Sequence, residues 1–408
     1  MSWTRLTLQV RTPLFGGDDP TRDDGAPARV PSIRGALRFW FRAVAAGHGE
    51  AELWKAEEAV FGSTATPSAI GLRVPKQPTI SGRGSKPNWA ITEQRARRHG
   101  FDGAQYRLGQ GLWDYNTGLR RGYVECGEPI DLDIRFSRDE QVNARFMLAL
   151  WAWLTYGGLG ARTRRGFGQL VCTAVHGDLR CGWTLADLLP PRDADGWQAL
   201  GKCAVPGTLP GHDALGWGEL LTAPPPKGDP LPEFPTLTPR WWAGSVLEKR
   251  SGSLGEALHR AGLRWRWFRA ADDDDRGAKP SQSTRSPEWR NVIHGDDDRY
   301  PIAAFGLPVG YFSRSSGTDF KATVTPELDG KQLRRACPVW LRPVLLPGGR
   351  WGVFTHVFYA RLLPKGAKLQ ITGGTERTLP PPPDMVVEEG WDRWLGGEPR
   401  LPDDYFPR

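Results

Sequence analysis

The sequence is poor in cysteine and lysine, and it lacks a long hydrophobic segment. Its five cysteines in 408 residues include no CxxC pair, which argues against a disulfide framework and is typical of a reducing cytoplasm. The longest apolar run, residues 146–154, is about half the length that a bilayer-spanning helix needs. The first ten residues, MSWTRLTLQV, contain no basic region followed by an apolar stretch, which is the pattern of an export signal. We therefore expect a cytoplasmic protein that does not bind a membrane.

Arginine supplies most of the positive charge. Of the 54 cationic residues only 11 are lysine, and the formal net charge is +8. A GC-rich genome alone would produce this preference. The alternative is that guanidinium groups bind phosphate through two hydrogen bonds at once, which lysine cannot do. The sign of the charge makes an anionic polymer a candidate partner without identifying it.

The first 176 residues alternate between strand and helix patterns. Strands are predicted where apolar and polar side chains alternate, and helices where apolar side chains recur at helical spacing. An irregular middle, residues 62–127, is expected to contain loops and short strands. The other predicted elements are a strand at 6–10, a helix at 32–44, a strand at 130–136, an apolar helix at 141–156 and a strand at 169–175. Together they give the βαββαβ order of a ferredoxin-like domain.

We predict an α+β protein with two tandem ferredoxin-like (RRM-related) domains and large loop insertions. The N-terminal domain is residues 1–176, a packed connector rich in Pro, Gly and Trp is residues 177–232, and the C-terminal domain is residues 233–408. The second domain repeats the plan loosely and contains an acidic insertion at Asp272–Asp275, which we interpret as a solvated loop. Its predicted elements are a strand at 234–242, a helix at 245–268 and strands at 321–325, 339–345, 351–363 and 369–372.

The first candidate site is a row of arginines on the first predicted helix, in the segment PSIRGALRFWFRA (residues 31–43). Arg34, Arg38 and Arg42 recur at every fourth position and form a stripe roughly 12 Å long. Three like charges in one row repel one another unless an anion lies along them. That anion is a phosphate backbone if the row binds nucleic acid, whereas a solvated face or acidic partners within the fold is the structural alternative.

The second candidate site is the glycine-rich segment GGLGARTRRGFGQ, residues 157–169. Its glycines permit close backbone approach and positive φ, and successive N–H groups form a cradle for an anion. Arg162, Arg164 and Arg165 add positive charge, and Phe167 offers a ring on which a base can stack. The spacing is neither a Walker loop nor a dinucleotide fingerprint. A glycine-rich turn that only packs is the alternative.

The two motifs together resemble the RAMP superfamily of CRISPR-associated proteins and, within it, the first RAMP subunit of the type III-B (Cmr) effector complex. The helical motif lies between TPLFGG (residues 12–17) and EEAVFGS (residues 57–63), and the glycine-rich motif follows. AAFGLPVGYF (residues 303–312) and RRACPVWLRP (residues 334–343) are similar to the C-terminal half of that subunit. The resemblance spans nearly the whole chain in order, except for the connector and the acidic run.

This resemblance implies assembly into a multi-subunit, RNA-guided complex of antiviral defence. It implies guide and target RNA and other Cmr subunits as partners, with RNA bound toward the 3′ end of the guide, and it implies a binding subunit, not a nuclease. We expect no cofactor. Carried over to this sequence, the RNA-binding residues are Arg34, Arg38 and Arg42 of the helix and, in the loop, Gly157, Gly158, Gly160, Arg162, Arg164, Arg165, Gly166, Phe167 and Gly168.

Two alternative functions remain open from the sequence. A metal-independent endoribonuclease of the same superfamily would need a general base and a cation near the scissile phosphate. Candidates are Asp18, Asp19, Asp23 and Asp24 in the loop after the first strand, with His48 after the first helix. Acids in such a loop are, however, usually turn formers. The other alternative is a structural adaptor whose basic face contacts only neighbouring protein subunits.

A metal site receives little support from the sequence. Cys172, His176 and Cys181 are close in sequence, and Cys203 is a candidate fourth ligand. No CxxC knuckle is present, and small buried thiols are common in strands such as the one that holds Cys172. We expect no bound metal.

Overall fold

The computed structural model describes most of the chain. The described residues are 2–17, 26–45, 50–90, 103–109, 111–114, 116–211, 231–270, 295, 299–313, 320–373 and 375–397. The chain divides into two compact units. The first comprises residues 1–229, 234–259 and 340–358, and the second comprises residues 230–233, 260–339 and 359–408.

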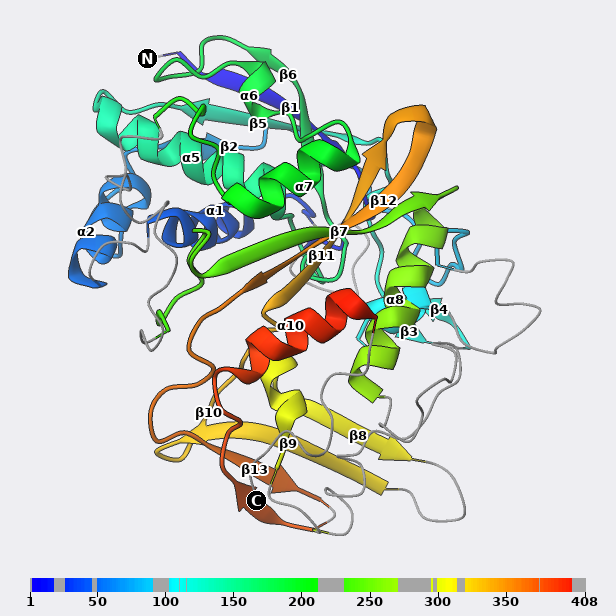
Figure 1. Cartoon of the computed structure of the whole chain (residues 1–408). Coiled ribbons are helices and arrows are strands. Elements are labelled where there is room, and N and C mark those ends of the chain that lie inside the picture. Colours follow the sequence, from blue (N-terminus) through cyan, green and yellow to red (C-terminus); the bar gives the residue numbers. More distant parts are fainter. Residues whose placement is uncertain are drawn as a thin grey trace. The chain divides into compact units, whose positions relative to one another are not determined.

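The first unit contains an antiparallel sheet with the strand order β2-β5-β1-β6 (Figure 1). Its strands are β1 (Thr4–Val10), β2 (Gly71–Arg73), β5 (Pro129–Arg135) and β6 (Leu170–His176). Leu6 is paired with Leu132 of β5 and Val175 of β6, so apolar side chains from three strands share one face. The strands and the two long helices follow in the βαββαβ order that the sequence predicts for this part of the chain.

Two helices supply the other half of this core. In α1 (Val30–Ala45) the residues Ile33, Leu37 and Phe41 are buried, as the helical spacing predicts. Helix α5 (Glu140–Tyr156) packs against α1 and is buried on nearly all sides, which accounts for its almost uninterrupted apolar sequence. It begins at Asp139, whose carboxylate accepts a hydrogen bond from the Gln141 N–H at 2.8 Å.

The irregular middle forms a smaller cluster in the same unit. It carries α4 (Gly103–Leu108), β3 (Trp113–Asp114) and β4 (Gly118–Leu119), while α2 (Glu50–Phe61), which precedes it, packs in the main core. Buried aromatic side chains, among them Phe15, Tyr123 and Phe167, form its core. Short strands joined by loops are therefore confirmed for this segment, and they place residues 103–123 near the glycine-rich segment.

The connector packs into the core of the first unit. It contains α6 (Leu185–Leu188) and α7 (Ala194–Cys203), and its residues Trp183, Trp197 and Leu200 are all buried. Helix α7 contacts β7 (Trp242–Ser251), which pairs with β12 (Arg350–Phe358) in a second sheet of order β11-β12-β7. The remaining strand is β11 (Val339–Leu346). The first unit thus continues past the predicted domain boundary at residue 176.

The predicted strand at 234–242 and the start of the predicted helix at residue 245 are wrong. The strand β7 occupies residues 242–251 instead, and α8 (Leu254–Ala270) begins only after it. The strand forms there because its backbone pairs with β12, about a hundred residues further along the chain. Such long-range pairing overrides local periodicity.

The described part of the second unit contains a five-stranded sheet of order β10-β9-β13-β14, with β8 paired to β9. The strands are β8 (Val309–Ser313), β9 (Phe320–Leu328), β10 (Lys331–Gln332), β13 (Lys368–Thr372) and β14 (Arg377–Leu379). Phe305 of the 3-10 helix η3 (Pro301–Phe305) stacks edge-on against Phe268, which also contacts Trp394 of α10 (Val386–Gly396). The mixed α+β class is confirmed, while the tandem ferredoxin-like arrangement stays a prediction because the later strands divide between two sheets.

No helix in the described residues combines the length and the apolar character that crossing a membrane requires. The acidic run Asp272–Asp275 lies outside the described residues.

Replacing Trp183 by alanine tests whether the connector belongs to the core. Because Trp183 is 4% exposed and packs in the main cluster, we expect Trp183→Ala to lower the free energy of unfolding by about 3 kcal/mol in denaturant titrations. The exposed Lys202→Ala, also in the connector, is the control and should change it by less than about 0.5 kcal/mol. Equal, small effects of the two variants would contradict the packed connector.

Candidate nucleic-acid interface

The arginine row on α1 already has an anion along it, and that anion is a protein side chain. Glu57 of α2 is 2% exposed and accepts hydrogen bonds from Arg38 at 2.7 Å and from Nη2 of Arg42 at 2.9 Å. Arg38 also donates to the carbonyl groups of Phe61 and Gly62. The interpretation that these two arginines face a phosphate backbone is therefore corrected: they hold α2 against α1.

Arg34 lies on the same side of α1 as Arg38. Its Nε is buried and has no hydrogen-bond partner among the described residues. At about 100° per residue, Arg34 is roughly opposite Ser32 and Ala36 on the helix. The arginine row and the opposite face of α1 therefore have different neighbours, which matters for the site described below.

The glycine-rich segment, residues 157–168, is a packed loop. It connects α5 to β6, and its backbone bonds to the segment that follows β1. The N–H of Ala161 donates to the Phe15 carbonyl at 2.9 Å, and the N–H of Gly168 donates to that of Pro13 at 3.0 Å. A Cβ at Gly160, where φ is +90°, would lie 2.5 Å from the Phe15 carbonyl oxygen. Glycine is thus required here by a close approach within the protein.

The three loop arginines are anchored in the protein. Nε of Arg162 donates to the Leu108 carbonyl at 2.9 Å, and burial lowers the pKa of its guanidinium group. Nη1 of Arg165 donates to the Arg107 carbonyl at 3.2 Å. The guanidinium group of Arg164 lies 4.7 Å from the centre of the Trp340 ring. These contacts fix the conformation of the loop.

Phe167 does not offer a ring for base stacking. Its side chain is fully buried, with its ring 5.7 Å from that of Phe15 and 5.8 Å from that of Trp89. Both contacts are edge-on aromatic pairs typical of a core. The expectation of a stacking platform at Phe167 is therefore corrected.

A cavity of about 360 Å³ joins the two predicted motifs, and we call it the glycine cavity. Gly158, Gly160 and Thr163 line it from the glycine-rich loop, and Ser32 and Ala36 line it from α1. The turn after β1 closes it through Gly16 and Gly17. No aspartate or glutamate of the described residues lines this cavity. The two motifs do converge, through the face of α1 that lies away from the arginine row.

Arg121 is a cationic lining residue that the sequence analysis missed. Nη2 of Arg121 donates to the Gly17 carbonyl at 2.9 Å, so the side chain reaches the turn after β1. The basic pair Arg120–Arg121 in the irregular middle was a signal, but nothing in the sequence places that segment beside the glycine-rich loop. The tertiary structure brings it there.

The outward face of the first sheet carries polar and charged side chains. Asp133 of β5 is 1% exposed and accepts hydrogen bonds from Arg5 at 2.7 Å and from Arg73 at 2.8 Å. The outward residues of β1 are Arg5, Thr7 and Gln9, none of which offers a ring for a base. Base stacking on this strand, the mode used by RRM proteins, has no platform there.

The described residues contain no group of three or more His, Cys, Asp and Glu side chains that could hold a metal ion. Cys172 is buried in β6, and burial raises the pKa of its thiol to about 11. Cys181 contacts the Glu140 carboxylate. The predicted nuclease candidates Asp18, Asp19, Asp23, Asp24 and His48 lie outside the described residues.

Comparison with known proteins agrees with the resemblance seen in the sequence. The family model described as the RAMP superfamily matches residues 7–171. The CRISPR system Cmr subunit Cmr1-2 of Pyrococcus furiosus is 28% identical over 178 residues, which are 40% of this chain and 91% of that protein. Subunit Cmr1-1 of the same organism is 30% identical over 149 residues, which are 35% of this chain and 39% of that protein.

A solved structure supports the fold. The crystal structure of Cmr1 from Pyrococcus furiosus in its apo form matches with a TM-score of 0.53 and 20% identity, covering 88% of this chain and 89% of that one. At this identity the likeness concerns the fold alone.

Neutralising Glu57 tests the role of the arginine row. Glu57→Gln leaves Arg38 and Arg42 without their anion, so we expect the free energy of unfolding to fall by about 2 kcal/mol in denaturant titrations. The exposed Glu128→Gln should change it by less than about 0.5 kcal/mol. A Glu57→Gln protein as stable as the wild type would contradict a structural role for the pair.

Protonation of Asp133 should account for part of the stability that the first unit loses at acid pH. The hydrogen bond from Arg5 lowers the pKa of the Asp133 carboxyl, with Arg73 contributing and burial opposing. A depressed pKa in the folded state stabilises the fold above the ordinary value near pH 4, and this stabilisation is lost as the pH falls. Unfolding measured from pH 7 to pH 3 should therefore show a shallower acid loss for Asp133→Asn than for the wild type. Parallel curves for the two proteins would contradict a contribution of Asp133 to the acid sensitivity.

Proposed function

We propose that the chain is a non-catalytic RNA-binding subunit of a type III-B CRISPR interference complex, because residues 7–171 match the RAMP superfamily model and the chain is similar to Cmr1 subunits. It contacts guide or target RNA toward the 3′ end of the guide and assembles with other Cmr subunits. Its role is antiviral defence. The glycine cavity is the RNA contact in this proposal.

The observation that carries the proposal is the convergence of two distant motifs on one cavity. Residues 32–36 and 158–163 are separated by more than a hundred positions, yet both line the glycine cavity. A turn and a helix packed only for stability have no need to leave a cavity between them, since protein interiors are close-packed. A cavity lined by backbone from glycines suits a ligand that approaches the main chain closely.

The chemistry of the cavity favours a phosphate group. Its first wall is the N-terminal half of α1, where the helix dipole favours an anion. Arg121 supplies a guanidinium group that can bind phosphate oxygens. The lining contains no described acid that would repel the ligand. Backbone and arginine contacts of this kind position a strand without reading its sequence.

The two alternatives predict different results. An adaptor that contacts only protein would bind RNA weakly and without a steep dependence on salt, because few counterions would be released. An endoribonuclease would cut RNA without added metal. Gly17, which lines the glycine cavity, directly precedes the segment of the sequence that holds the predicted acids, and this adjacency in sequence keeps the nuclease as an alternative.

Two variants of Ser32, one that adds a negative charge and one of the same size that does not, test the RNA contact. Ser32 is exposed and lines the glycine cavity, so Ser32→Glu adds a negative charge there with little expected effect on folding. We expect RNA affinity in filter-binding titrations to fall about tenfold for Ser32→Glu, whereas Ser32→Gln, of equal size, should stay within about threefold of the wild type. Equal affinities for the two variants would remove the glycine cavity from the RNA site.

Titrations at 50 mM and 200 mM salt separate RNA binding from the adaptor. Several phosphate contacts should lower the affinity by two orders of magnitude or more across this range. Replacing the loop arginines together is a poor test, because Arg162 and Arg165 bind carbonyl groups inside the protein and their loss would disturb the loop. A flat salt dependence would favour the adaptor.

Incubation with end-labelled single-stranded RNA in chelator tests the absence of catalysis. We expect intact RNA after prolonged incubation with the purified protein. Cleavage that disappears in Asp19→Ala or His48→Ala would replace the proposal with the endoribonuclease. Cleavage that persists in a variant with Asp18, Asp19, Asp23, Asp24 and His48 all replaced by alanine would point to a contaminating nuclease, since it would not depend on this chain's candidate residues.

A further inference from the structure

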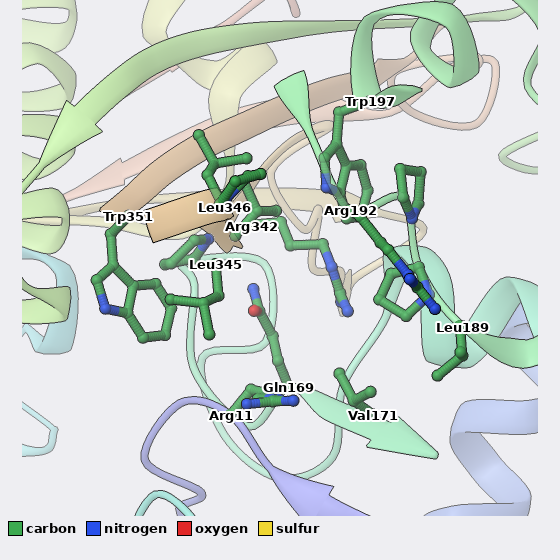
Figure 2. Close-up of a pocket in the computed structure, with 15 residues that line it drawn as sticks. Arg11, Gln169, Val171, Leu189, Arg192, Trp197, Arg342, Leu345, Leu346 and Trp351 are labelled. Atoms are coloured by element: carbon green, nitrogen blue, oxygen red, sulfur yellow. The ribbon is translucent and has the colours of Figure 1, made fainter. Parts of the chain in front are cut away.

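A second cavity of the first unit has no role in the function proposed above. It has a volume of about 410 Å³, and we call it the arginine pocket. It lies where β6, the segment between α6 and α7, and the hairpin of β11 and β12 meet (Figure 2). None of its lining residues lines the glycine cavity. Its volume is within the range of small-ligand sites.

The charged side chains that line the arginine pocket are all positive in the described residues. Arg11, Arg192 and Arg342 line it, and no aspartate or glutamate of the described residues does. The other walls are mostly leucine, valine and proline side chains, with Trp351 at one end and Leu345, 42% exposed, beside it (Figure 2). Charge complementarity therefore calls for a ligand that joins an anionic group to a flat or apolar body.

Three buried polar atoms around the pocket have no hydrogen-bond partner among the described residues. They are Oε1 of Gln169, Nε of Arg342 and Nε1 of Trp197. Gln169, the residue before β6, is 2% exposed, and its amide extends toward the centre of the pocket (Figure 2). Buried polar atoms are normally paired, so each of them needs a partner. An acceptor and two donors around one cavity match the mixed polar edge of a nucleobase.

We propose that the arginine pocket binds a single nucleotide, whose base packs against the apolar wall beside Trp351 with its polar edge toward Gln169 and whose phosphate lies at Arg192. Guanidinium groups bind phosphate through paired hydrogen bonds, and aromatic rings stack on any base. A peptide strand would instead seek free main-chain groups, whereas the groups that lack partners here belong to side chains. A nucleotide can pair with the Gln169 side chain and with the cationic side of the pocket at once.

Arg342 gains most from such a ligand. It is 3% exposed, and its two Nη atoms donate to the carbonyl groups of Leu154 at 2.8 Å and Gly157 at 2.9 Å. These acceptors are neutral, and burial lowers the pKa of Arg342 to about 9. A phosphate in the pocket would bring a negative charge near a cation that has lost most of its hydration. Electrostatic attraction is strongest in such a poorly solvated setting.

The nucleotide has two possible sources, a free mononucleotide or an unstacked residue of an RNA strand. The chemistry of recognition is the same for both, so the experiment must separate them. The residues that line the arginine pocket do not line the glycine cavity. The nucleotide proposal therefore does not depend on the RNA contact proposed for the glycine cavity.

The experiment is calorimetric titration of the full chain with AMP, UMP, ribose 5-phosphate and inorganic phosphate. We expect a nucleoside monophosphate to bind at least about tenfold more tightly than ribose 5-phosphate, because the base adds contacts of its own. Arg192→Ala should weaken nucleotide binding about tenfold. Its control is Arg138→Ala, since both side chains are exposed and only Arg192 lines the pocket.

A second variant addresses the base. Gln169→Leu removes the amide acceptor. It should weaken the binding of the nucleoside monophosphate and leave the affinity for ribose 5-phosphate unchanged. If thermal melting shows that Gln169→Leu is unfolded, Trp351→Ala provides the same test from the half-buried rim. Competition with labelled single-stranded RNA identifies the source: displacement by AMP assigns the pocket to a residue of the strand, and simultaneous binding assigns it to a free nucleotide. Either result supports the proposal.

Three results would overturn it. The first is no nucleotide binding by the wild type together with unchanged RNA affinity in Arg192→Ala. The second is equal affinity for inorganic phosphate and AMP, since the base would then go unrecognised. The third is tighter binding of an acidic tyrosine-containing peptide, which would assign the pocket to a protein partner. Loss of RNA binding in Ser32→Glu with intact AMP binding would show that the two cavities act separately.

Discussion

The positions of both cavities depend on the buried guanidinium group of Arg342. It extends from β11 and binds the carbonyl groups of Leu154 and Gly157 at the end of α5. The last carbonyl groups of a helix have no partner within it, and a cation there also complements the negative end of the helix dipole. Gly157 is the first residue of the glycine-rich loop, so this contact fixes the direction in which the loop leaves the helix. The glycine cavity lies along its first half, and the arginine pocket begins at Gln169, directly after it.

The high arginine content has a largely structural explanation in the residues that the sequence analysis singled out. Arg38 and Arg42 share the carboxylate of Glu57, and Arg162 binds the carbonyl group of Leu108. A guanidinium group carries five N–H donors in a planar fork, so one side chain can tie together several backbone segments. A count of arginines therefore says little about ligands until each has been placed. The arginines that line the two cavities are Arg121 in one and Arg11, Arg192 and Arg342 in the other.

The first sheet shows why the two proposed ligand sites involve loops in this fold. Its inward face is filled by apolar side chains from β1, β5 and β6. On its outward face Asp133 is held by Arg5 and Arg73, an arrangement that stabilises the pairing of neighbouring strands. Neither face leaves a ring for a base on β1. The segments that join strands and helices carry the glycines of one cavity and Gln169 of the other, and a rigid scaffold with functional loops is a common division of roles.

The sequence by itself determined the main elements of the first 176 residues, because apolar periodicity records which face of a strand or helix is buried. It predicted β1, α1, β5, α5 and β6 in order, and it singled out both motifs that line the glycine cavity. It did not determine which face of α1 meets the loop, that Glu57 neutralises the arginine row, or that Phe167 is buried. Only the tertiary structure decided these points, and it also decided that β7 pairs with β12, that Arg121 reaches the turn after β1 and that Arg342 reaches the first residue of the glycine-rich loop. Each of these contacts joins residues far apart in the chain, and local spacing carries no record of such partners.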